Sequence, residues 1–282
     1  MTATWYETLM SAQGTQIKNS STERRLFMER YQLAAYSWEE ISEMDRKNKT
    51  LLIPLGSTEQ EGTHLPLGVD TYVAEAFAKE VAAATGALVC PTLPVGYSDW
   101  FLEFTGTISL KMETFTQVVR EYCNSLIHHG FRKFIFVNGH GGNAPGVDVV
   151  ARELKLENDV DIAMVLLWKI ADSLAKDIPG LKEKAFKHAG ELMTSLMLYL
   201  HPDTVTMKRA KAEFVRSNKP HFEAKSSLGP ATFKGIEISH YDKAKSLTAS
   251  GIMGDPLAAT AQNGGILFDH IKLYLIEMVK NF

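Results

Sequence analysis

The chain has 282 residues and 45% of them are hydrophobic, which is enough for one large α/β domain or two small ones. Its formal net charge of −3 gives no basic surface for nucleic acid or an anionic membrane. No apolar run approaches the roughly 20 residues that cross a bilayer. The polar N-terminus has no signal-peptide core, so we expect a cytoplasmic protein.

The chain contains two cysteines, Cys90 and Cys123, in apolar segments without CxxC spacing. A disulfide framework needs more cysteines, and neither thiol has a nearby histidine that would make it a nucleophile. We therefore expect two buried free thiols.

Predicted strands and helices alternate along most of the chain. Ser37-Trp38-Glu39-Glu40 has the capping-box form, which predicts a helix running toward Arg46. Apolar runs predict buried strands over residues 50–55, 87–91, 133–137 and 161–168. Helical spacing of apolar residues predicts helices over residues 70–84, 115–126, 143–157 and 190–200, and a last helical region from Asp255-Pro256 toward Lys280.

This alternation of near-continuously apolar strands with helices is typical of an α/β fold, with a parallel sheet covered on both faces. We predict an N-terminal arm over residues 1–36 and a single domain over residues 37–282. Residues 214–251 are rich in Lys, Ser, Gly and Pro and show poor periodicity. They form a solvated excursion, or else a lid or subunit contact.

Polar clusters follow the predicted strands. Glu59, Glu61 and Asp70 come after the first strand, His140 lies in the Gly-rich turn after the strand 133–137, and Trp168 ends its own strand. Ligands of open α/β sheets bind at the carboxyl ends of the strands, so we expect these clusters to converge. Carboxylates and imidazole together are the ligands of a divalent metal.

Individual residues keep alternatives open. Glu59 and Glu61 are separated by one residue, so an extended backbone directs both carboxylates the same way. Asp70 opens a helix and either caps it or binds metal. The turn around His140 lacks the GxGxxG and GxxxxGK[ST] patterns, which disfavours a nucleotide site. Trp168 either packs against a flat substrate ring or fills the core.

His188, Glu191 and Ser195 are spaced i, i+3 and i+7, which predicts that they share one face of a helix. Apolar residues between them indicate that the rest of this helix is buried. Ionisable groups at the start of a buried helix are costly unless they are paired or bind a metal, so we predict a functional role for this face.

Three segments together resemble the creatininase family: Gly56-Ser57-Thr58-Glu59-Gln60 with residues 62–70, the turn 138–143, and His188-Ala189-Gly190-Glu191. The resemblance extends from about residue 37 to 282. It implies a three-layer αβα sandwich, a homo-oligomer that is commonly a hexamer, and one or two zinc, manganese or iron ions per chain. Glu59, Asp70 and His140 match the metal ligands of the family, and His188 matches a histidine that shuttles protons.

Two departures from the family pattern concern the second metal. The family usually has histidine at the position of Glu61, and creatininase itself has a glutamate ligand at the position of Gly142. Glu61 can still bind metal through oxygen, and Glu191 is the candidate for the missing carboxylate. An oxygen-richer site shifts preference from zinc toward manganese or another harder ion.

We therefore predict a metal-dependent hydrolase that cleaves a C–N bond of a small cyclic or formyl amide with metal-activated water. Glu191 or Glu61 accepts the water proton, and His188 protonates the leaving nitrogen. His64, Trp168 and Asn143 are the predicted substrate contacts. The alternatives are C–C hydrolysis of a cyclic diketone derived from inositol, and a non-catalytic ligand-binding scaffold.

Overall fold

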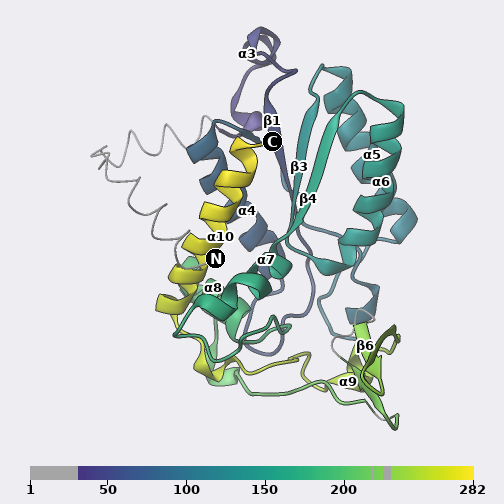
Figure 1. Cartoon of the computed structure of the whole chain (residues 1–282), viewed down its shortest axis with the longest axis vertical. Helices are drawn as coiled ribbons and strands as arrows, with labels where there is room; N and C mark the ends of the chain where they lie inside the picture. Colours follow the sequence, from purple (N-terminus) through teal and green to yellow (C-terminus); the bar gives the residue numbers. More distant parts are fainter. Residues whose placement is uncertain (1–30, 218, 225–229) are drawn as a thin grey trace.

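A parallel sheet forms the centre of the molecule (Figure 1). The computed structural model describes residues 31–217, 219–224 and 230–282. Within them, four strands pair in the order β2-β1-β3-β4, all parallel. Their bounds are β1 Thr50–Leu55, β2 Leu88–Val89, β3 Lys133–Asn138 and β4 Asp161–Leu166. The parallel sheet predicted from the apolar runs is confirmed.

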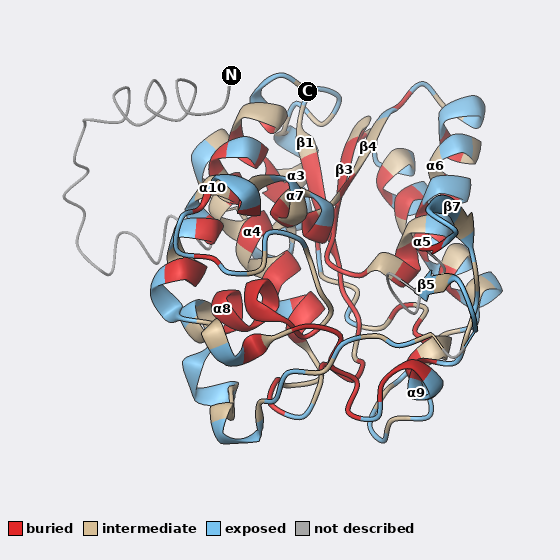
Figure 2. Ribbon diagram, turned by 60° about the horizontal axis from the view of Figure 1, so that its bottom comes forward, coloured by how far each residue is buried: buried red, intermediate tan, exposed pale blue. Residues whose placement is uncertain are grey.

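The apolar strands form two cores because successive side chains point to opposite faces. On β1, Leu51, Ile53 and Leu55 join one buried cluster, whereas Leu52 joins the other. β3 alternates in the same way, with Phe136 in the first cluster and its neighbours in the second. Both faces of the sheet are therefore covered, and β1 and β3 are mostly buried between the helices (Figure 2).

Helices supply the two outer layers (Figure 1). One face carries α4 Val69–Thr85, α7 Leu167–Leu174, α8 Glu191–Leu200 and α10 Ala261–Lys280. The other face carries α5 Met112–His128 and α6 Ala144–Glu157. The expected three-layer αβα sandwich is confirmed.

Several predicted boundaries are wrong by a few residues. The strand expected over 161–168 ends at Leu166, and Trp168 lies on the first turn of α7. The helix expected from residue 190 begins at Glu191, so His188 lies outside it. β2 has two residues where five were expected. Asp255 caps only the short helix Pro256–Ala258, and Thr260 caps α10.

The helix predicted to start at Ser37 is shorter than expected. α3 spans Trp38–Glu43, and its capping box is present as expected: Ser37 Oγ accepts from the Glu40 backbone N–H, and the Glu40 carboxylate accepts from the Ser37 N–H. Most of the predicted N-terminal arm, residues 1–30, lies outside the described residues. Its last part lies along the sheet, where Gln32 forms a parallel bridge with Val89.

Most of the segment 214–251 lies apart from the central sheet (Figure 1). It forms a small antiparallel sheet of β5 Phe222–Ala224, β6 Pro230–Phe233 and β7 Ile236–Ser239, followed by α9 Ala244–Leu247. A lid or subunit contact remains a prediction for it. Cys90 and Cys123 are free and buried, as expected. Across the described part of the chain, no helix is long and apolar enough to cross a membrane.

Candidate metal centre

Three loops at the carboxyl ends of the strands bring ionisable side chains together. Glu59 and Glu61 follow β1, His140 follows β3, Asp70 lies on the first turn of α4, and His188 precedes α8. In the described residues, possible metal-binding atoms form two groups, each within 4.8 Å: Glu59 with Asp70 and His140, and Glu59 with Glu61 and His188. The predicted convergence of the clusters is confirmed, and Glu59 belongs to both groups.

The first group is built around the imidazole of His140. Its Nδ1 lies 3.0 Å from Asp70 Oδ2 and 3.3 Å from Glu59 Oε1. Its Nε2 lies 2.8 Å from the carbonyl oxygen of Tyr97, to which it donates. Metal-binding histidines usually donate the other ring N–H to a carbonyl or carboxylate in this way, which orients the ring. Nδ1 therefore faces the two carboxylates as a metal ligand would.

Asp70 is held by neighbours on both oxygens. Oδ1 accepts from Trp168 Nε1 at 3.0 Å, and Oδ2 accepts from Ser57 Oγ at 3.0 Å. The N-cap of α4 is Gly68, so the alternative that Asp70 serves as the cap is wrong. Its carboxylate is oriented for binding at the site.

The second group contains carboxylate oxygens without hydrogen bonds. Both oxygens of Glu61, and Oε2 of Glu59, have no hydrogen-bond partner among the described residues, and Glu61 is 0% exposed. Leaving a buried carboxylate without a partner is costly, and a bound cation removes that cost. The residues present therefore fit a divalent metal.

Burial and mutual charge shift the pKa values of these groups. Burial, with the charges of Asp70 and Glu59, raises the pKa of Glu61 well above its usual range. Burial alone would also raise the pKa of Glu59, but His140 lowers it. Burial opposes protonation of His140, yet the neighbouring carboxylates hold its pKa well above the usual value. In the metal-free protein these shifts favour the protonated forms of Glu61 and His140.

His188 lies on a turn before α8. Ala189 beside it has a φ of +52°, a backbone conformation that breaks the helical path. The His188 ring stacks on Phe101 with centroids 4.9 Å apart, and its Nε2 lies 3.4 Å from Glu61 Oε2. Burial lowers the pKa of His188. The imidazole is therefore favoured in its neutral form.

Glu191 is placed differently from the prediction. It belongs to neither group among the described residues. Its Oε2 accepts from the backbone N–H groups of Lys182 and Glu183 at 2.8 and 2.6 Å. The expected helical face is wrong, because α8 begins at Glu191 and Ser195 Oγ accepts from the Thr260 N–H. Glu191 fixes the loop that carries His188.

The three predicted substrate contacts are buried and bonded to the protein itself. His64 Nε2 lies 2.9 Å from Thr194 Oγ1, and burial lowers the pKa of His64 to about 4. Asn143 donates to the carbonyl of Gly56 and accepts from the Tyr97 N–H, which ties two loops together. His64 and Asn143 therefore stabilise the loops around the site through hydrogen bonds within the protein.

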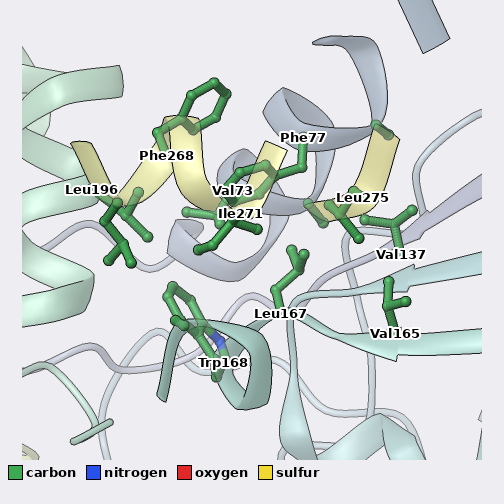
Figure 3. Packing of buried hydrophobic residues seen from close by; sticks show 14 of the residues in the cluster. Val73, Phe77, Val137, Val165, Leu167, Trp168, Leu196, Phe268, Ile271 and Leu275 are labelled. Carbon is green, nitrogen blue, oxygen red and sulfur yellow. The ribbon is translucent and has the colours of Figure 1, made fainter. Parts of the chain in front are cut away.

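Trp168 lies within the apolar core beside α4 and α10 (Figure 3). The residue is 6% exposed, and its ring stacks on Phe186 with centroids 5.2 Å apart. The ring of Trp168 therefore fills the core, which was one of the two predicted alternatives. Its indole N–H contacts the site by donating a hydrogen bond to Asp70.

Gly142 lies against the neighbouring loop. A Cβ there would come within 2.3 Å of the Tyr97 carbonyl oxygen and 2.4 Å of His140 Nε2. The backbone as it stands has no room for the glutamate that the family resemblance places at this position.

Sequence reasoning missed other residues at the site. Tyr97 acts through its backbone carbonyl, Phe101 through its ring, and Gly251 through its carbonyl. Gln60 was missed as well. Its position between Glu59 and Glu61 is the one feature of the sequence that could have indicated a role at the site.

Comparisons with known proteins point to one family. The family model Creatininase, described as creatinine amidohydrolase, matches residues 34–279. A creatinine amidohydrolase of Pseudomonas putida is 32% identical over 78% of this chain and 84% of its own. A mycofactocin precursor peptide peptidase of Mycobacterium tuberculosis is 31% identical over 80% and 83%.

A third relative and a solved structure extend the comparison. A 3-dehydro-scyllo-inosose hydrolase of Thermotoga maritima is 32% identical over 58% of this chain and 54% of its own. A solved structure of creatininase with manganese in its title has a TM-score of 0.72 and 25% identity, and the match covers 89% of this chain and 98% of that one. The chain therefore belongs to the creatininase family and is a metal-dependent hydrolase.

Proposed function

We propose that this enzyme hydrolyses a C–N bond of a small cyclic or formyl amide. The observation that carries the proposal is the pair of groups sharing Glu59, with buried carboxylate oxygens that lack protein partners in the described chain. Two relatives aligned over most of this chain have names that denote cleavage of amide or peptide bonds, which supports C–N chemistry.

Glu59, Asp70 and His140 would hold one divalent metal, and the carboxylates of Glu59 and Glu61 would hold a second one beside His188. Such a metal, when bound, lowers the pKa of water and polarises a carbonyl group. The oxygen-rich second group favours manganese or another hard ion over zinc.

His188 would move the proton. Its Nε2 faces Glu61 Oε2 at 3.4 Å, and the side chain is 13% exposed, so one part of the ring reaches the surface of the site. Because burial keeps the imidazole neutral, it can accept a proton and later pass it to the leaving nitrogen. Glu191, bonded to backbone N–H groups, keeps the His188 loop in place.

A second candidate is cleavage of a C–C bond in a cyclic diketone derived from inositol. The Thermotoga maritima relative favours it, although the alignment covers 58% of this chain. The same group of residues would serve, with an enolate leaving in place of an amine. The first candidate rests on longer alignments.

Turnover assays separate these candidates. The purified, manganese-loaded enzyme is offered a panel of cyclic and formyl amides and a panel of diketo-cyclitols. We expect turnover of amides. It should be lost in H188Q while the metal held by Glu59, Asp70 and His140 stays bound, and unchanged in H129Q, which alters an exposed histidine. Activity on diketo-cyclitols alone would overturn the proposal, and unchanged cellular activity of H188Q would favour a non-catalytic scaffold.

The proposed assembly is a homo-oligomer of six chains in the cytoplasm. The mass of the purified protein in solution tests the first part, and cell fractionation tests the second.

A further inference from the structure

The side chain of Gln60 is buried between the two groups of candidate ligands. It is 4% exposed and lies between Glu59 and Glu61 in the chain. Its Oε1 accepts from the Gly62 backbone N–H at 2.9 Å, and its Nε2 donates to the Gly251 carbonyl at 3.3 Å. A flipped amide would put its NH₂ against the Gly62 N–H and its oxygen against the Gly251 carbonyl. The orientation of the amide is therefore fixed at both ends.

The amide nitrogen of Gln60 also faces His188. Gln60 Nε2 and His188 Nε2 lie 2.9 Å apart. An amide NH₂ can only donate, so this contact is a hydrogen bond when His188 Nε2 accepts and carries no hydrogen. The neutral imidazole then has its proton on Nδ1. Two acceptors near the same ring nitrogen, the backbone carbonyl oxygen of Gln60 at 3.1 Å and Glu61 Oε2 at 3.4 Å, would favour the other tautomer, but that tautomer sets the ring N–H against the amide NH₂.

The Gln60 amide packs against Gly251, which is distant in the sequence and leaves room for it because it has no side chain. Gly251 has a φ of +85°, and a Cβ on it would come within 1.7 Å of Gln60 Oε1. Thr248 Oγ1 accepts from the Gly251 N–H at 3.1 Å and donates to the Ile252 carbonyl at 2.8 Å, which fixes this turn. The stretch after α9, where the outlying segment returns, thus supplies a wall of the site.

We propose that Gln60 is a positioning residue that presents His188 to the carboxylates as the Nδ1–H tautomer, with Nε2 unprotonated. His188 Nε2 then begins the cycle as a proton acceptor. When the proton arrives, it takes the place of the hydrogen bond from Gln60. The catalytic consequence rests on the proposed function, whereas the tautomer does not.

The tautomer is measured directly by solid-state ¹⁵N NMR of the full-length protein labelled at histidine, before and after zinc loading. The His188 signal is assigned by its absence in H188Q. We expect Nδ1–H in the wild type in both states. Q60E keeps the shape of the side chain but replaces the donor with an acceptor, so we expect Nε2–H in its zinc-free form. An Nε2–H wild type, or an unchanged tautomer in Q60E, would overturn the proposal.

Kinetics provide a second readout. Q60E and Q60L should lower kcat by about 10- to 100-fold, because the reacting nitrogen is misoriented, with little change in KM. Q60L adds no charge, so it is the variant to interpret if Q60E alters metal content. Q262E, on the exposed side of α10, should retain wild-type kinetics. Wild-type kcat in both Gln60 variants would contradict the positioning role, while the NMR result stands without any substrate.

Discussion

The indole Nε1 of Trp168 donates a hydrogen bond of 3.0 Å to Oδ1 of Asp70, which lies 98 positions earlier in the chain. Trp168 lies in the apolar core (Figure 3), so this bond links the core to the candidate metal centre. Asp70 Oδ2 faces His140, so the bond from Trp168 fixes the direction of the carboxylate.

Replacing Trp168 by phenylalanine should therefore weaken metal binding. W168F keeps an aromatic ring in the core and removes only the N–H donor. Removing a partner of a ligating carboxylate typically lowers metal affinity 10–100-fold. Isothermal titration with Mn²⁺ measures the change, with W38F, at a 78% exposed tryptophan, as the control. Equal affinity of W168F and wild type would show that the bond does not orient Asp70.

The candidate ligands could be predicted because each is tied to a strong local pattern. Glu59 and His140 follow continuous apolar strands, and Asp70 begins an amphipathic helix. Parallel strands present their carboxyl ends at one edge, so convergence follows from the fold class. The two buried clusters, one on each face of the sheet, follow from the same continuous apolar strands.

Trp168 and His188 were misplaced for different physical reasons. The apolar run from Asp161 continues without a break into α7, and periodicity cannot separate a buried strand from the start of a buried helix. Before α8, the helical spacing extends to His188, but Ala189 adopts a positive φ that no residue pattern marks. The contact between Gln60 and Gly251 joins residues 191 positions apart and depends on tertiary structure.

Introducing at Gly142 the glutamate that the resemblance assigns to creatininase itself should not create a metal ligand. A Cβ at this position meets the Tyr97 carbonyl and His140, so G142E and G142A should both lower the free energy of unfolding by about 1–3 kcal/mol. Urea unfolding measures this. G265A, in the interior of helix α10, is the comparison: its Cβ would lie 3.2 Å from the ring of the exposed Tyr199, which can move aside, so it should lose less stability than G142A. A stable G142E chain that binds extra metal would contradict the close approach seen at Gly142.

Glu61 should make the metal-free protein less stable as pH rises. Its folded pKa is raised above the reference value of 4.5 by burial and by Asp70 and Glu59. Its stabilising contribution is therefore complete below about pH 4.5 and is lost as pH rises through the raised pKa. E61Q cannot ionise, so the Tm of metal-free E61Q should exceed that of metal-free wild type by an amount that grows with pH. The growth should fall between about pH 5 and about pH 8, the range in which the raised pKa values of buried carboxyl groups lie. Parallel Tm curves for the two proteins would contradict a buried, unpaired Glu61.

Glu191 should contribute to stability without holding metal. Its carboxylate accepts from the N–H groups of Lys182 and Glu183, and Glu183 accepts in return from the Glu191 N–H at 2.7 Å. E191Q should lower the free energy of unfolding by about 1–3 kcal/mol with unchanged metal per chain. E121Q, at an exposed glutamate, should change it by less than about 0.5 kcal/mol. Loss of metal in a folded E191Q chain would restore Glu191 as a ligand.

The central claim is that Glu59 is shared by two metal-binding groups, and elemental analysis of manganese-saturated, desalted protein tests it most directly. The two groups predict about two metal ions per chain in the wild type. E61Q should hold about one, and E59Q, which damages both groups, less than about one. The same metal content in wild type and E61Q would contradict the claim, because Glu61 would then hold no ion.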